Sequence, residues 1–196
     1  MSQSRDYSRL AKRIKKLEKK YDFKEDITTG PTSDQVDDLR AFEILCHAEL
    51  EAYFETTALR ILEKAEKKWK SKHCANYNLA CLFLYAEAIK NRNFSIATMV
   101  GKAVTDYRRS VERNNGIKSD NIKKLYQPLG FKMDDFDSCF LSNLDQLGSQ
   151  RGAFAHQSFK TIEITSKNDI FKKIDDIVEE IKDFESVLNE KMNGDI

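Results

Sequence analysis

The chain has 196 residues, a third of them charged, and a formal net charge of +1. This length suits one domain, or one domain with an appended arm, that buries a sizeable core, and the near-zero charge means that any contact with nucleic acid has to be local. With seven glycines, two prolines, four scattered cysteines, no signal peptide and no long apolar span, the composition predicts a mostly helical protein without a membrane span, in a reducing, cytoplasmic setting.

Residues 1–24 predict a basic amphipathic helix, because nine basic and three acidic side chains surround one thin apolar stripe. Such a helix either holds an RNA backbone, for which Lys12, Arg13 and Lys16 are the candidate contacts, or holds a partner helix, or docks as a solvated helix on the rest of the protein. A linker and turn then follow up to residue 32. We therefore expect a basic arm with its linker, residues 1–32, ahead of a main domain, residues 33–196.

The segment 33–72 contains no helix breaker and predicts one very long helix or two nearly collinear ones, with Ser33 as the N-cap. Four polar side chains recur on it at gaps of three, four and four, which places them on one face of a helix: Arg40, Glu43, His47 and Glu51. They form either a run of surface salt bridges or a polar wall beside a functional site. In the second case one carboxylate orients a catalytic histidine or pairs with a catalytic arginine.

Three shorter helices are predicted between residues 76 and 127. The first, 76–90, is strongly apolar and is expected at the centre of the core. Ser95 caps the second, which runs to a stop at 114–116, and Ser119 or Asp120 opens the third, which Pro128 ends. The basic end of the second helix is either a phosphate contact or solvated surface: Arg108, Arg109 and Arg113.

The four cysteines are interpreted as small buried hydrophobic residues. His73, Cys74 and Cys81 are close in sequence, but structural zinc sites use paired, closely spaced ligands, and a second pair is missing. We therefore expect no metal and no cofactor.

A helix opened by Asp134 or Asp135 leads to an arginine and a histidine separated by four residues, Arg151 and His156. An arginine fork grips a phosphate through two parallel hydrogen bonds, and a histidine takes or gives a proton near neutral pH, so the pair suits phosphoryl chemistry on nucleic acid. The alternative is an ordinary helix C-terminus, with Arg151 near the last carbonyls and His156 in a loop. Five helical positions turn a side chain by roughly 140°, so the two converge only if the helix bends or ends near Gly152, or if the arginine reaches around.

The chain closes with a predicted helix from Ser166 to about Lys191, which has one apolar stripe and follows a short alternating segment, 161–165, that predicts an extended piece. Residues 163–196 carry ten acidic side chains against five lysines. This acidic end either contacts the basic arm within the same chain or binds a partner.

Three segments together resemble one superfamily. Residues 151–156, Arg-Gly-Ala-Phe-Ala-His, resemble the Arg-x(4–6)-His motif of the HEPN superfamily. Residues 37–54, which contain His-Ala-Glu-Leu-Glu-Ala-Tyr, are similar to the HAxLExY helix of its RiboL-PSP-associated and MAE-like branches. Residues 121–131, a short helix that ends in Leu-Gly-Phe, resemble those branches as well. The polar residue that often follows the arginine in this superfamily is here Gly152.

The resemblance implies an all-α fold, a HEPN-like bundle of four main helices with extra helices and the basic arm. It also implies a metal-independent endoribonuclease that acts on RNA as a homodimer, in which the 2′-hydroxyl attacks the adjacent phosphorus to give a 2′,3′-cyclic phosphate and a 5′-hydroxyl. In that reaction Arg151 holds the scissile phosphate and His156 is the general base or acid. Such proteins commonly serve prokaryotes in toxin–antitoxin or antiphage defence, so an antitoxin or a defence-system partner is expected.

Two other functions remain open from the sequence. The first is a non-catalytic HEPN-like module that binds RNA or a nucleotide. This function stays open because Gly152 replaces the polar residue that often follows the arginine. The second is a helical protein–protein adaptor or antitoxin-like partner, which the near-zero net charge and the long amphipathic helices favour.

Overall fold

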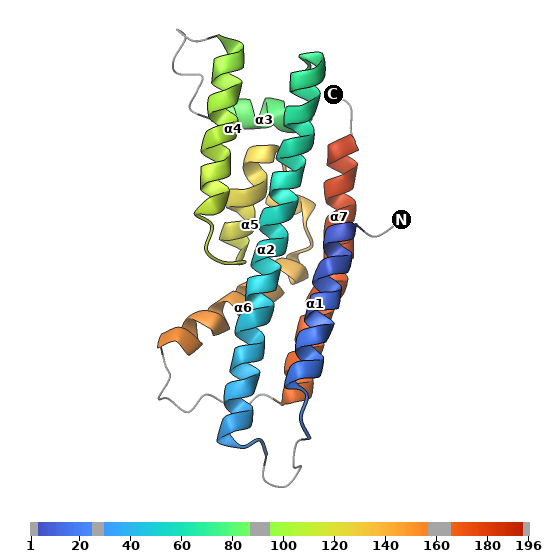
Figure 1. Ribbon diagram of the computed structural model, residues 1–196, viewed down its shortest axis with the longest axis vertical. Coiled ribbons are helices and arrows are strands. Elements are labelled where there is room, and N and C mark those ends of the chain that lie inside the picture. Colours follow the sequence, from blue (N-terminus) through green and yellow to red (C-terminus); the bar gives the residue numbers. More distant parts are fainter. Residues whose placement is uncertain (1–3, 25–29, 87–94, 157–165, 194–196) are drawn as a thin grey trace.

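The computed structural model describes residues 4–24, 30–86, 95–156 and 166–193, and the side chains of these residues except 153–156 and 193. Within these ranges the chain forms seven α-helices, two 3₁₀ helices and no strand (Figure 1). The predicted all-α fold is therefore confirmed. The elements are α1 Arg5–Tyr21, α2 Ser33–Lys72, α3 Tyr77–Tyr85, α4 Ile96–Glu112, α5 Ser119–Tyr126, η2 Gln127–Leu129, η3 Met133–Asp135, α6 Ser138–His156 and α7 Lys167–Asn193.

The 40-residue helix α2 runs through the length of the molecule and contacts all six other α-helices (Figure 1). It is one continuous helix, which confirms the first of the two predicted alternatives and excludes two nearly collinear helices. Its N-cap is Thr32 rather than the expected Ser33, because Thr32 and Gln35 form a reciprocal capping box that satisfies two backbone N–H groups. Its buried face is apolar along most of its length and anchors the other helices around it.

Helix α1 lies against α2 and α7, and its buried side chains belong to the same hydrophobic core as theirs. The prediction that the arm docks on the rest of the protein is therefore confirmed for its apolar stripe. The residues of that stripe are buried: Tyr7, Leu10, Ile14 and Leu17. Two ion pairs tie it to α7, Lys15 with Asp175 at 2.7 Å and Asp22 with Lys167 at 2.6 Å. The basic arm thus contacts the acidic end of its own chain. The boundary at residue 32 stays a prediction.

The predicted apolar helix at 76–90 is present in its described part and buries Leu79 and Leu82, but the expectation that it lies at the centre of the core was wrong. Helix α3 ends at Tyr85, and it lies across one end of the bundle with Leu84 71% and Tyr85 58% exposed. Apolar composition alone does not tell a central helix from a peripheral one, because burial depends on which elements pack against it. The buried side of α3 instead holds the segment after α5: Asn78 donates to the Leu129 carbonyl at 2.9 Å.

A cluster of aromatic rings joins α2, α5, α6 and α7 at the middle of the bundle. The ring of Phe184 is 5.4 Å from that of Phe54 and 5.2 Å from that of Tyr126, both edge-on. The Tyr126 hydroxyl also donates to the Phe54 carbonyl at 2.9 Å, so this buried polar group is satisfied. The cluster fixes where α6 leaves the core, and therefore where the motif residues lie.

Helix α6 starts later than expected. Asp134 and Asp135 belong to η3, and Asp137 accepts from the backbone N–H of Phe140 at 2.9 Å, so the helix opens at Ser138. The predicted extended piece at 161–165 lies outside the described residues.

Candidate functional site

Helix α6 carries the predicted motif from the core toward the surface, and in Figure 1 its C-terminal end points away from the bundle. Leu144 and Leu147 hold it by their burial, and Asp145 accepts from the backbone N–H and the hydroxyl of Ser119 at 2.7 and 2.6 Å. The helix continues through Gly152 and ends at His156. Arg151 and His156 therefore do not converge through a helix end at Gly152. The backbone of His156 is helical rather than part of a loop.

Arg151 is half-buried and faces the loop between α4 and α5. Its Nη1 atom donates to Oδ1 of Asn115 at 3.2 Å. The close approach of loop and helix depends on Gly148, since a Cβ there would lie 2.8 Å from Cγ of Lys118. An amide is neutral, so this contact positions the guanidinium without cancelling its charge.

His47 and Glu51 of α2 lie next to this loop. His47 is 1% exposed, and burial together with the nearby charge of Arg151 lowers its pKa to about 4, so the imidazole is neutral at physiological pH. Its Nδ1 atom is 3.9 Å from Oε2 of Glu51 and has no hydrogen-bond partner among the described residues. Glu51 accepts from the backbone N–H of Gly116 and so fastens the loop to α2.

The other two members of the polar line lie further along α2. Glu43 is buried, and burial raises its pKa to about 7 against the opposing charge of Lys173 on α7. Burial also lowers the pKa of Lys173, whose Nζ donates to Oε1 of Gln150 on α6 at 3.0 Å. Arg40 forms an ion pair with Asp37 at 3.0 Å.

The polar line of α2 is thus divided by its surroundings. His47 and Glu51 lie beside the loop that holds Arg151, Glu43 lies beside Lys173, and Arg40 pairs along its own helix. A run of surface salt bridges does not describe it, because Glu43 and His47 are buried. The side chain of His156 lies outside the described residues, so a carboxylate that orients it stays a prediction.

The five candidate RNA contacts lie in two separate places. On α1, Lys12 and Lys16 are exposed, whereas Arg13 forms an ion pair with Glu49 at 2.7 Å. On α4, Arg108 forms an ion pair with Glu66 at 2.9 Å, and Arg109 is exposed and 3.8 Å from Asp106. Of the five, Arg109 lines a cavity formed by described residues.

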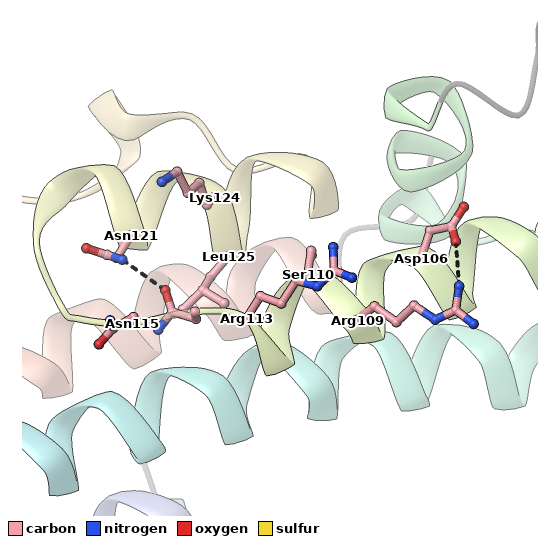
Figure 2. Close-up of a pocket in the computed structure, with 9 residues that line it drawn as sticks. Asp106, Arg109, Ser110, Arg113, Asn115, Asn121, Lys124 and Leu125 are labelled. Atoms are coloured by element: carbon pink, nitrogen blue, oxygen red, sulfur yellow. Dashed lines mark hydrogen bonds and ion pairs between the residues drawn. The ribbon is translucent and has the colours of Figure 1, made fainter.

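That cavity is a groove of about 540 Å³ between α4, α5 and the loop that joins them (Figure 2). It is rich in basic and amide side chains, among them Arg109, Arg113, Asn115, Asn121 and Lys124. The sequence alone does not predict Asn115, Asn121 and Lys124 as site residues, because the Asn-Asn-Gly at 114–116 indicates only the end of a helix. The available signal was three amides within eight residues of a basic helix end.

The described residues contain no group of three or more His, Cys, Asp or Glu side chains that could hold a metal ion. Among the same residues, none of the helices combines the length and the apolar character needed to cross a membrane.

One comparison with known proteins places most of the chain in a single family. The model of the family described as RiboL-PSP-HEPN matches residues 8–190, which is most of the chain. Comparison with curated proteins and with solved structures gave no match.

Proposed function

The chain belongs to the RiboL-PSP-HEPN family, and from this membership we propose that it is a metal-independent endoribonuclease. The family is a member of the HEPN superfamily, whose functions are nuclease and RNA-related. The observation that carries the proposal is the position of Arg151. Its guanidinium lies at the surface end of α6, held by a neutral amide beside a groove with basic walls.

Arg151 is suited to hold a phosphate. A guanidinium has five N–H donors, and the described contact with Asn115 uses one of them. The neighbouring His47 is neutral because its pKa is lowered to about 4, so it neither repels the guanidinium of Arg151 nor competes with it as a cation. The charge of Arg151 is therefore free to stabilise the negative charge that grows on the phosphoryl oxygens in the transition state.

In the proposed reaction the 2′-oxygen of the RNA forms a bond to the adjacent phosphorus while the bond from phosphorus to the 5′-oxygen breaks. A general base takes the proton of the 2′-hydroxyl, and a general acid gives a proton to the leaving 5′-oxygen. The products are a 2′,3′-cyclic phosphate and a 5′-hydroxyl. We assign one of these proton transfers to His156, which lies five positions after Arg151 on α6.

His47 is not the proton carrier in this proposal. It is 1% exposed, and a pKa of about 4 makes it a weak base at neutral pH. His73 lies at the far end of α2. His156 is the histidine that shares a helix with Arg151, so we assign the proton transfer to it. One histidine supplies one proton transfer, so a homodimer that brings two motifs to one cleft supplies both.

The chemistry is tested with a single-stranded RNA and a matched substrate that carries a 2′-deoxy nucleotide at the cut position. We expect cleavage of the RNA in the presence of EDTA, a cyclic phosphate identified by mass spectrometry, and an inert deoxy substrate. Arg151→Ala and His156→Ala should abolish cleavage. Full cleavage of the deoxy substrate, or strict dependence on an added divalent metal, would show that the mechanism is wrong.

A non-catalytic RNA-binding module is the second candidate, favoured by Gly152 where a polar side chain often follows the arginine. His156→Ala separates the two functions, because it should leave RNA affinity largely intact while it removes cleavage. For the biological role, we propose toxin–antitoxin or antiphage defence with a cognate partner. Growth arrest on expression, relieved by His156→Ala, is the expected result, and harmless expression of an active enzyme would argue against that role.

A further inference from the structure

The groove between α4 and α5 has a basic lining whose charge is mostly uncompensated. Arg109 and Arg113 are one helical turn apart at the end of α4, and Lys124 of α5 contributes a third cation to the same lining (Figure 2). The carboxylate in the lining is Asp106, which is 3.8 Å from Arg109 with both side chains more than half exposed, so this pairing is loose. Arg113 and Lys124 form no ion pair with any described residue.

The groove is continuous with the proposed active site. Asn115 belongs to the groove lining, and its Oδ1 atom accepts the hydrogen bond from Arg151. Arg151 therefore lies directly beyond the groove lining, at its Asn115 end. The loop between them is held firmly, since Asn121 donates to Asn114 at 3.1 Å and Asn114 donates to Glu55 at 3.0 Å.

We propose that this groove binds the single-stranded RNA that flanks the cut, with Arg109, Arg113 and Lys124 holding phosphates on one side of the scissile phosphate at Arg151. The inference rests on the proposed function and adds a path for the substrate. Rows of Arg and Lys follow the backbone of a single strand, the exposed amide of Asn115 offers its Nδ2 donors to base edges, and Leu125 gives an apolar floor. An acidic polypeptide would use the charges but not the link to a phosphate-holding arginine.

The inference is tested by binding. Fluorescence anisotropy measures the affinity of a 2′-O-methyl single-stranded oligonucleotide, which cannot be cleaved, over a range of salt concentrations. The triple variant Arg109→Gln, Arg113→Gln, Lys124→Gln should bind at least about tenfold more weakly near 0.1 M salt. A plot of its log affinity against log salt should be less steep by about 2, at roughly 0.7 per lost phosphate contact. Lys123→Gln is the matched control, because Lys123 is exposed on the same helix and does not line the groove.

The outcomes separate this inference from the proposed function. If Arg151→Ala abolishes cleavage while the triple variant binds and cleaves like Lys123→Gln, the groove inference is overturned and the nuclease stands. If wild-type protein cleaves nothing but the triple variant still loses RNA affinity, the groove inference is supported and the nuclease proposal fails. If polyglutamate of equal charge binds as tightly as RNA through the same three residues, the site is one for an acidic polypeptide and the inference is overturned. The single variants Arg113→Gln and Lys124→Gln replace the triple variant if circular dichroism shows that it does not fold.

Discussion

Arg151 Nη1 and Asn115 Oδ1 lie 3.2 Å apart, although 36 positions separate the two residues in the chain. This hydrogen bond joins the motif helix α6 to the loop that closes the basic groove between α4 and α5. It places the motif arginine beside the groove lining and orients its guanidinium.

Arg151→Lys is expected to lower kcat for RNA cleavage by about 100-fold or more, because an ammonium keeps the charge but loses the planar fork that holds two phosphoryl oxygens. Steady-state kinetics on a defined RNA measure this. Arg5→Lys, an exposed change on α1, serves as the control. Activity near that of wild type would mean that Arg151 acts through charge alone or takes no part.

Asn115→Asp places a carboxylate where the amide now receives the Arg151 N–H. The expected charge-assisted pair occupies the guanidinium and opposes phosphate binding, so KM should rise by about tenfold. Asn189→Asp makes the same change at an exposed position on α7 and should leave KM unaltered. An Asn115→Asp enzyme with wild-type KM would show that Arg151 does not hold the substrate.

Gly152→Ala should stabilise the protein by about 0.5–1 kcal/mol, because alanine favours a helix more than glycine does and the new Cβ meets no described atom within 4 Å. Gly130→Ala should destabilise it instead, since Gly130 has a φ of +92° and a Cβ there would be 2.6 Å from the Tyr77 ring. Urea unfolding compares the two. If Gly152→Asn also raises kcat, a polar group after the arginine assists catalysis.

Glu43→Gln should stabilise the protein more at pH 8 than at pH 5. A folded-state pKa of about 7, raised by burial from 4.5, means that the unfolded state binds fewer protons between these values, so wild-type stability falls as the pH rises through that window. The advantage of the variant over wild type should therefore grow by about 2 kcal/mol from pH 5 to pH 8. Urea denaturation at the two pH values measures the change, and a constant difference would contradict the assignment.

His47→Leu should show the opposite trend. Burial and then Arg151 lower the folded-state pKa of His47 from 6.5 to about 4, so the unfolded state binds more protons in this window and wild-type stability is lost as the pH falls through it. The variant lacks this loss, and its stability relative to wild type should rise by about 2 kcal/mol from pH 7 to pH 5. NMR of the His47 ring provides a direct check, because an imidazole that titrates near 6.5 would rule the prediction out.

Local patterns in the sequence were enough for the helical class and for the apolar stripe of α1, whereas they left open whether α2 is one helix or two nearly collinear ones. These features depend on residue spacing and on breakers, which act over a few positions. The motif residues Arg151 and His156 were predicted from spacing and resemblance, and their catalytic roles stay a prediction. The same patterns failed for the burial of α3, because Leu84 and Tyr85 are as apolar as core residues and are exposed only through the arrangement of the other helices.

The polar line of α2 shows the same limit. Its spacing places the four residues on one face. Only the packing of α6, α7 and the 113–118 loop places His47 near Arg151, bonds Glu51 to the loop, and leaves Glu43 near Lys173. The groove depends on tertiary structure entirely, because Arg113, Asn115 and Lys124 meet where the chain turns at Gly116, with a φ of +132°. Side-chain periodicity is a property of a single helix, whereas the partners of a buried charge are set by which helices pack together.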